Sequence, residues 1–336
     1  MPNTSSPTGT ATRRPRWRRR LRIAAIVTLS AVGLVLASAA ANLALESAER
    51  SSITPYGEKV QVSGGALNVY REGSDGSTIV LLSGLGTAAP ALDFAPLIRA
   101  LGGYKIVVVE GFGYGYSDTN APARTLENIT AELHEALSKL DIDEPYVLMG
   151  HSLAGFYTLH YANQYPDEVS AVVGIDPTVP ATRVEQAAPA GETDASGWRA
   201  PWERAPSATG LVRWATSISP ALAEPAGDAY TAAERERIRL MSIWNFANPA
   251  VTAETIEMGN NARRLDGLTY PDDLPVLTFL AQESIDSIPR WYEKHERQLR
   301  NVKRQELVVL DGGHYLHWTH SPAMAEKITE FLGEGR

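Results

Sequence analysis

Short, mostly apolar runs without a single charge recur along the chain, and they limit the folds open to it. The clearest are Thr78–Leu82, Ile106–Val109, Tyr146–Met149, Ala171–Ile175, Val276–Leu280 and Leu307–Leu310. Strands that are apolar throughout suit a parallel sheet buried on both faces, whereas strands with one wet face alternate in polarity. Segments with helical spacing, such as residues 126–140, separate these runs. The sequence therefore predicts an α/β, doubly wound architecture with a mostly parallel central sheet flanked by helices.

Two parts of the chain depart from this alternation. Residues 59–62 and 67–70, bounded by glycines, are typical of a β-hairpin that precedes the sheet. Residues 178–273 are rich in Ala, Pro and Gly, and they contain helical segments but no convincing strand. A helical insertion between two sheet strands is typical of a cap. We therefore expect a core formed by residues 56–177 and 274–336, with a helical cap at residues 178–273.

The N-terminus has the features of a membrane anchor. Residues 1–22 contain seven arginines and no acid, and an uncharged run follows at residues 23–45. About 20 apolar residues span the hydrocarbon core of a bilayer, and the flanking arginines stay on the cytoplasmic side. We expect a basic cytoplasmic segment at 1–22, a transmembrane anchor at 23–45 and a polar linker at 46–55. The folded part would then lie outside the cell membrane.

A cleaved signal peptide is the alternative for the same segment. Its most apolar part, residues 23–37, has the length of a signal-peptide core, and Ala37-Ser38-Ala39 resembles a small-residue cleavage site. Cleavage there would produce a secreted protein in place of an anchored one. Both alternatives put the folded part outside the cytoplasmic membrane.

Composition excludes several other classes of protein. Of the 31 lysines and arginines, seven precede residue 23, which leaves 24 basic against 39 acidic residues. Such an acidic body binds nucleic acid poorly, because phosphate neutralisation needs clustered cations. The chain has no cysteine, so disulfides, thiolate metal sites and cysteine nucleophiles are excluded as well. Nothing in the composition predicts an oligomeric state.

The strongest chemical signal is the sequence Gly-His-Ser-Leu-Ala-Gly at residues 150–155, which directly follows an apolar strand and opens a helix. A nucleophile on so sharp a turn needs small residues two positions before and after it, and Gly150 and Ala154 meet that need. The N–H groups at the start of the helix favour a developing anion. We therefore expect Ser152 to be a nucleophile.

With this motif the chain resembles the α/β-hydrolase family over about residues 60–331. Residues 82–86, Leu-Ser-Gly-Leu-Gly, follow a strand where the family has its His-Gly-x oxyanion turn, with Ser in place of the usual His. Residues 110–117 look like the family's D-x-x-G-x-G-x-S turn, with Glu for Asp. By position, the resemblance implies an oxyanion hole formed by the backbone N–H groups of Leu85 and Leu153.

The resemblance also implies a catalytic histidine after the last strand. His314 stands there in the sequence Asp-Gly-Gly-His, whose glycines let the loop turn the imidazole toward the edge of the sheet. Of the other six histidines, three lie on expected helices, one is the variable residue of the nucleophile turn, and two follow His314. We expect His314 to be the general base and His317 to be a supporting loop residue.

The acid that would complete a catalytic triad is open among three carboxylates. Most members of the family carry an Asp after the strand before the last, but Ser284 occupies that position here. Some members take the acid from the strand that follows the nucleophile helix, where this chain has Asp176. A carboxylate there would orient the imidazole and stabilise its charged form. We expect Asp176 to be the acid, with Glu283 and Asp286 as alternatives.

These residues predict a serine esterase or lipase-like hydrolase that needs neither a metal nor an organic cofactor. His314 would take the proton of Ser152, the resulting alkoxide would form an acyl-enzyme, and water would release the acid. A dehalogenase would need an Asp at position 152. Two alternatives stay open: a proline iminopeptidase-like aminopeptidase, and a catalytically inactive hydrolase fold that binds a ligand.

The expected substrate is a small-molecule ester or a lipid-like molecule, because the enzyme is expected beside a membrane. Aromatic side chains of the cap would line an acyl pocket or simply pack the cap onto the sheet. They are Trp198, Trp202, Trp214 and Trp244. An aminopeptidase would need an acidic side chain that binds the substrate amine. The candidates are Glu234, Glu254 and Glu257.

Overall fold

An eight-stranded sheet lies at the centre of the computed structural model, which describes residues 16–142, 144–180 and 204–333. The strands are β1 (Glu58–Val62), β2 (Gly65–Glu72), β3 (Thr78–Leu82), β4 (Lys105–Glu110), β5 (Tyr146–His151), β6 (Val169–Ile175), β7 (Val276–Ala281) and β8 (Gln305–Leu310). Their order is β1-β2-β4-β3-β5-β6-β7-β8. Strands β1, β2 and β4 pair antiparallel in that order, and all other pairs are parallel. The predicted α/β fold with a mostly parallel sheet is confirmed.

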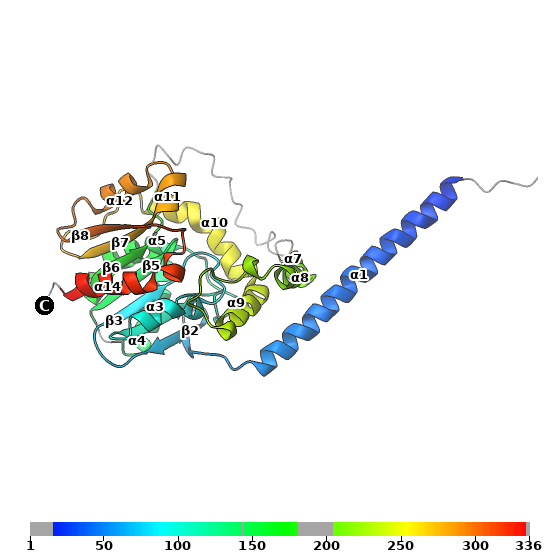
Figure 1. Ribbon diagram of the computed structural model, residues 1–336, viewed down its shortest axis with the longest axis horizontal. Helices are drawn as coiled ribbons and strands as arrows, with labels where there is room; N and C mark the ends of the chain where they lie inside the picture. Colours follow the sequence, from blue (N-terminus) through cyan, green and yellow to red (C-terminus); the bar gives the residue numbers. More distant parts are fainter. Residues whose placement is uncertain (1–15, 143, 181–203, 334–336) are drawn as a thin grey trace, which may run out of the picture.

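Helices cover both faces of this sheet. Helices α4 (Leu126–Lys139) and α5 (Ala154–Gln164) lie on one face, and α3 (Ala95–Ala100) and α14 (Ser321–Gly333) lie on the other. The other described helices outside the insertion that follows β6 and after α1 are α2 (Pro90–Asp93), α11 (Gln282–Ser287), α12 (Trp291–Leu299), α13 (Leu316–Thr319) and the 3₁₀ turn η1 (Pro166–Glu168). The arrangement is visible in Figure 1.

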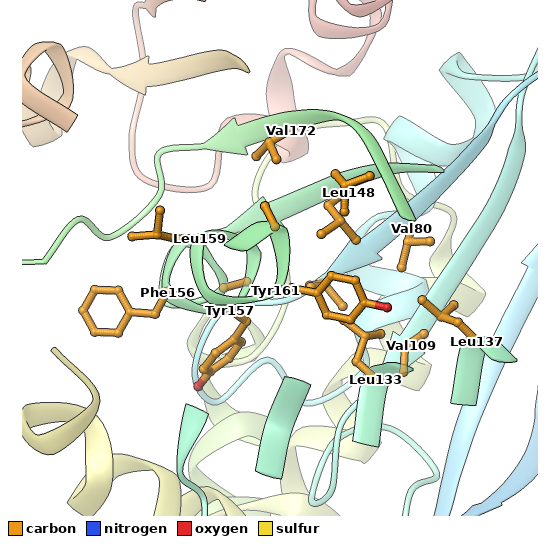
Figure 2. Close-up of a cluster of buried hydrophobic side chains, with 14 of the residues drawn as sticks. Val80, Val109, Leu133, Leu137, Leu148, Phe156, Tyr157, Leu159, Tyr161 and Val172 are labelled. Carbon is orange, nitrogen blue, oxygen red and sulfur yellow. The ribbon is translucent and has the colours of Figure 1, made fainter. Parts of the chain in front are cut away.

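Alternate side chains of each apolar strand supply the two cores. Val80 and Leu148 point toward α4 and α5, where they pack with Leu133 and Leu159 (Figure 2). Their neighbours along the strands, such as Met149, belong to the core beneath α3 and α14. Successive side chains of a strand point to opposite faces, so a run that is apolar at every position is what a sheet covered on both faces requires.

The described part of the insertion between β6 and β7 is helical. Its elements are α7 (Ala205–Ala208), α8 (Leu211–Ile218), the 3₁₀ turn η2 (Pro220–Leu222), α9 (Ala232–Asn245) and α10 (Pro249–Arg264), and we refer to them as the cap helices. Residues 178–180 and 204–273 contain no strand. Helix α9 packs on the body through a separate buried cluster that includes Met241 and Trp244.

Helix α1 (Arg16–Ser52) precedes the sheet as one long helix, and its N-terminal half runs away from the rest of the protein (Figure 1). Within the described ranges it is the one helix whose length and composition would allow it to cross a membrane. Its most apolar 18-residue stretch has no buried residue. A signal sequence near the N-terminus would meet the same criteria of length and composition, so both alternatives for this segment remain.

The polar linker expected at residues 46–55 is wrong as far as Ser52, because α1 continues to that residue. Glu46 and Arg50 form an i,i+4 ion pair 2.8 Å apart, which supports the helix locally. Glu49 forms an ion pair with Arg213 of α8. The polar composition that suggested a linker therefore reflects contacts with the cap helices.

Candidate active site

Ser152 lies on the sharp turn between β5 and α5. Its φ of +54° is in the left-handed region that non-glycine residues rarely adopt. The turn is held by hydrogen bonds from the N–H of Ser152 to the carbonyl of Ile175 (3.1 Å) and from the N–H of Thr178 to the carbonyl of Ser152 (2.7 Å). A Cβ on Gly150 would lie only 2.9 Å from the Thr158 methyl group. This close approach explains the small residue at position 150.

The structure brings Ser152, His314 and Asp176 within hydrogen-bonding distance. His314 Nε2 lies 2.8 Å from Ser152 Oγ, and His314 Nδ1 lies 2.6 Å from Asp176 Oδ2. The residues follow β5, β8 and β6, whose carboxyl ends meet at one edge of the sheet because these strands are parallel. A hydroxyl, an imidazole and a carboxylate in this order can carry out nucleophilic catalysis.

Asp176 is fully buried, and four groups donate hydrogen bonds to its carboxylate. The donors are His314 Nδ1 (2.6 Å), Ser284 Oγ (2.5 Å), Trp291 Nε1 (2.9 Å) and the backbone N–H of Ala281 (3.2 Å). Burial by itself raises the pKa of Asp176, but the hydrogen bonds from the side chains outweigh it, and the pKa lies below its usual value. The carboxylate is therefore ionised at neutral pH.

The two alternative acids lie elsewhere. Glu283 and Asp286 are exposed on α11. Asp286 accepts a hydrogen bond from Gln282 Nε2 (2.9 Å), and the Glu283 carboxylate lies beside Gly313, where an added Cβ would be 2.7 Å from Glu283 Oε2. Among the hydrogen bonds of the described residues, neither carboxylate bonds to the imidazole that Asp176 contacts.

The loop after β3 lies against the nucleophile. A Cβ on Gly84 would be 2.8 Å from Ser152 Cβ and 3.0 Å from His151 Nδ1, so the close approach of this loop to Ser152 leaves no room for a side chain at position 84. Within the described residues, no hydrogen bond is donated by the backbone N–H of Leu85 or Leu153. Both N–H groups are available to a ligand, and their use as an oxyanion hole stays a prediction.

The sequence did not predict the side-chain contacts that support this loop. The N–H of Gly86 donates to Tyr114 Oη (3.2 Å), and Tyr114 in turn donates to Glu254 Oε2 (2.8 Å). Tyr157 of α5 donates to the other oxygen of Glu254. Burial raises the pKa of Glu254. Tyr114 belongs to the Gly-rich stretch at 110–117, but nothing in the local sequence connects it with a glutamate 140 positions later.

The support beneath His314 was also missed in part. His151 is buried, and its Nε2 donates to the backbone carbonyl of His314 (3.2 Å). Burial and the neighbouring imidazoles of His317 and His314 lower the pKa of His151 well below its usual value, so its ring is neutral. His317 is buried as well and bonds to Asp93 Oδ2 (2.7 Å), which positions the loop that carries His314. The variable residue of the nucleophile turn is thus a structural contact.

The cap residues considered as substrate contacts have different surroundings. Trp214 is exposed on α8, whereas Trp244 is buried in α9 and donates to Glu49 of α1 (3.1 Å). Trp198 and Trp202 lie outside the described residues. Packing rather than a pocket therefore accounts for Trp244.

The three glutamates proposed for binding an amine also differ. Glu234 caps α9 and pairs with Arg99 (2.6 Å), and Glu257 accepts a hydrogen bond from Asn260 (2.9 Å). Glu254 lines a cavity that also touches Tyr114. Glu234 lines a different pocket, together with its partner Arg99.

The fold and the Ser–His–Asp geometry define a class of α/β proteins with a nucleophile turn at the edge of a parallel sheet. A family model described as alpha/beta hydrolase fold matches residues 77–332, which is most of the chain. The chain belongs to the α/β-hydrolase family. This membership supports hydrolase activity.

Individual relatives are more distant. The protein YbdG of Bacillus subtilis is 36% identical over 133 residues, which cover 39% of this chain and 41% of that protein. Epoxide hydrolase A from Mycobacterium thermoresistibile is 21% identical, with a TM-score of 0.61 over 83% of this chain and 98% of that chain. A thermophilic esterase from Thermogutta terrifontis is 17% identical, with a TM-score of 0.57 over 82% and 98%. The two solved structures share the fold.

Proposed function

We propose that this protein is a serine hydrolase that cleaves carboxylic esters, of the esterase or lipase type. The observation that carries the proposal is the chain of hydrogen bonds from Ser152 Oγ to His314 (2.8 Å) and on to Asp176 (2.6 Å). His314 Nε2 takes the proton of Ser152 as the alkoxide attacks the carbonyl carbon. The resulting oxyanion accepts hydrogen bonds from the N–H groups of Leu85 and Leu153.

Collapse of the tetrahedral intermediate breaks the ester C–O bond, and His314 returns its proton to the leaving alkoxide. Water then attacks the acyl-enzyme, again with His314 as base, and releases the carboxylic acid and free Ser152. Asp176 stays ionised throughout and stabilises the imidazolium, in keeping with its lowered pKa.

We also propose that α1 anchors the enzyme in the cell membrane, with residues 1–22 in the cytoplasm and the hydrolase domain outside. Cleavage after Ala39 would remove Ser38, which accepts a hydrogen bond from Trp214 (2.7 Å) and donates one to the carbonyl of Thr209 (2.6 Å). These contacts with the cap helices favour an intact anchor over a cleaved signal peptide.

The alternatives have less support. For an aminopeptidase, both oxygens of Glu254 already accept hydrogen bonds from tyrosines, and its raised pKa favours the neutral acid over the anion that would bind an amine. A protein that only binds a ligand would not need the hydrogen bonds that join Ser152, His314 and Asp176.

A fluorophosphonate probe tests the proposed nucleophile. The purified full chain should be labelled, Ser152→Ala should not, and Ser74→Ala, at an exposed and remote serine, should be labelled like the wild type. Absence of label on the wild-type protein would refute the serine hydrolase.

Substrate class and topology need separate measurements. We expect turnover of p-nitrophenyl esters of graded chain length and none of proline p-nitroanilide; the opposite preference would favour the aminopeptidase. Protease added to intact cells should digest the hydrolase domain, and protection of residues beyond position 52 would contradict the proposed orientation.

A further inference from the structure

Helix α1 contacts the cap helices through polar side chains that lie within its uncharged segment, residues 23–45. Ser38 Oγ donates to the carbonyl of Thr209 (2.6 Å) and accepts from Trp214 Nε1 (2.7 Å). Asn42 Nδ2 donates to the carbonyl of Ser207 (3.1 Å). The start of α8 therefore lies beside residues 38–42 of α1, well before α1 ends.

Arg213 of α8 completes this contact. Its Nε donates to Asn42 Oδ1 (2.8 Å), and its guanidinium forms a bidentate ion pair with the carboxylate of Glu49. Asn42 is 2% exposed and Arg213 is 4% exposed, so the polar groups between the helices are paired and shielded. Paired polar groups are what a contact at membrane depth requires, since lipid offers them no partner.

The thickness of a bilayer sets the depth of this contact. About 20 helical residues, at 1.5 Å each, cross a hydrocarbon core of ~30 Å. Counted from Ile23, the first residue after the arginines, that length ends near Asn42. If α1 spans the membrane, the segment that binds α8 lies at the outer boundary of the hydrocarbon core, and α8 has to lie at the same level.

The exposed side of α8 is apolar, and it lies next to the contact with α1. Leu211, Trp214 and Ile218 share one side of the helix, and Leu222 follows in η2. Outside α1, these four are among only seven exposed large apolar side chains in the described parts of the chain, and Ile218 is 85% exposed. Arg213 and Thr216, on the other side, are buried.

We propose that α8 and η2 form a second membrane contact, which lies in the interface of the outer leaflet beside α1. The inference rests on the proposed anchor and extends it to a surface of the cap. An apolar helix face with a Trp is typical of helices that lie in the interfacial plane. The occupant of this surface is the lipid bilayer, because the neighbouring helix that fixes its level is itself exposed and apolar.

A pocket of about 300 Å³ starts beside this surface. Its wall runs from Leu222 through Phe246 and Val251 of the cap helices to Gly86 and Thr87 in the loop after β3. Gly86 follows the proposed oxyanion donor. The pocket therefore extends from the lipid-facing turn to the loop that carries the proposed oxyanion donor, and it suits an ester that carries an acyl chain and enters from the outer leaflet.

Depth-dependent quenching tests the second contact. Because the chain has no cysteine, a single introduced thiol carries a nitrobenzoxadiazole fluorophore cleanly. The full chain with Ile218→Cys, Leu29→Cys or Ser74→Cys is placed in phosphatidylcholine nanodiscs with or without lipid that carries a nitroxide near the top of its acyl chain. We expect the labels at 29 and 218 to lose roughly half of their fluorescence and the label at 74 to lose almost none.

The outcomes separate this inference from the anchor. If the label at 29 is quenched and the label at 218 behaves like that at 74, the anchor stands and the second contact is refuted. If neither is quenched, the anchor fails and the second contact fails with it. Efficient cross-linking of two unlabelled Ile218→Cys chains by a bifunctional thiol reagent would show a second copy on this surface and would also refute it.

A kinetic measurement tests the route to the pocket. Ile218→Asp should lower the hydrolysis of a long-chain ester embedded in nanodiscs by about tenfold and leave a water-soluble short-chain ester unaffected, because only the first substrate depends on the lipid contact. Unchanged hydrolysis of the embedded ester would refute entry from the leaflet.

Discussion

Ser284 Oγ donates a hydrogen bond of 2.5 Å to Asp176 Oδ2, the same carboxylate oxygen that lies 2.6 Å from His314 Nδ1. Ser284 stands where most members of the family carry the acid itself. In this chain the side chain at that position orients a carboxylate that comes from β6. The proposed acid and the vacant acid position are thus in direct contact, and this contact can be tested.

The choice of acid is the first prediction. Asp176→Ala should lower kcat on a p-nitrophenyl ester by about 10³–10⁴-fold, because the imidazole loses the carboxylate that orients it and stabilises its charge. Glu283→Ala should change kcat little, since its exposed carboxylate does not bond to His314. A larger loss in Glu283→Ala than in Asp176→Ala would overturn the assignment.

Because Asp176 and Ser284 are in contact, the carboxylate that orients His314 can be moved from position 176 to position 284 as a test. Asp176→Ser should be nearly inactive, and adding Ser284→Asp should restore part of kcat, because a carboxylate returns next to the same imidazole nitrogen. Ser284→Ala alone should cost about tenfold, as expected for one lost hydrogen bond to a charged group. If the double variant keeps the melting temperature of the wild type but has no higher kcat than Asp176→Ser, a carboxylate at position 284 cannot replace the one at position 176.

The loop that carries the proposed oxyanion donor should tolerate no side chain at position 84. In Gly84→Ala the new Cβ would lie 2.8 Å from Ser152 Cβ, so the nucleophile or the loop has to move. We expect kcat to fall by about 10²-fold, the usual effect of misplacing a reacting group by about 1 Å. Gly103→Ala is the control, because nothing lies within 4 Å of its added Cβ. Equal activity of the two variants would contradict the described approach.

Stability should depend on pH through Glu254. Burial raises the pKa of this carboxyl in the folded protein above the unfolded value of about 4.3, so the folded state binds the proton more tightly. Its contribution to stability is fully present below about pH 4.3 and is lost as pH rises through the folded pKa. Glu254→Gln should therefore flatten the fall in melting temperature with rising pH.

The matched control for this measurement is Glu257→Gln, one helical turn further along α10 and only half-buried. It should keep the pH dependence of the wild type. If the melting temperature of Glu254→Gln changes with pH in the same way as that of the wild type, Glu254 binds its proton equally well in the folded and the unfolded state, and the prediction is wrong.

Much of the fold was predictable because its signals are local. The charge-free runs at 78–82 and 276–280 coincide with β3 and most of β7, and the nucleophile turn follows β5 as expected. Ser152, His314 and Asp176 could be named from the strands that they follow, since parallel strands bring their carboxyl ends to one edge. The structure brings the three side chains together, and their catalytic roles stay predictions until the variants are measured.

Contacts between distant segments were out of reach of the same reasoning. Residues 46–52 look like a linker by composition, yet they continue α1, and Glu49 there pairs with Arg213 more than 160 positions later. The pairing of Tyr114 with Glu254 and the support of Asp176 by Ser284 are of the same kind. Periodicity and turn residues act over a few neighbours and so determine strands, helices and the nucleophile turn. Which polar side chains share a buried hydrogen bond depends on how the loops and cap helices pack, and only the folded chain decides that.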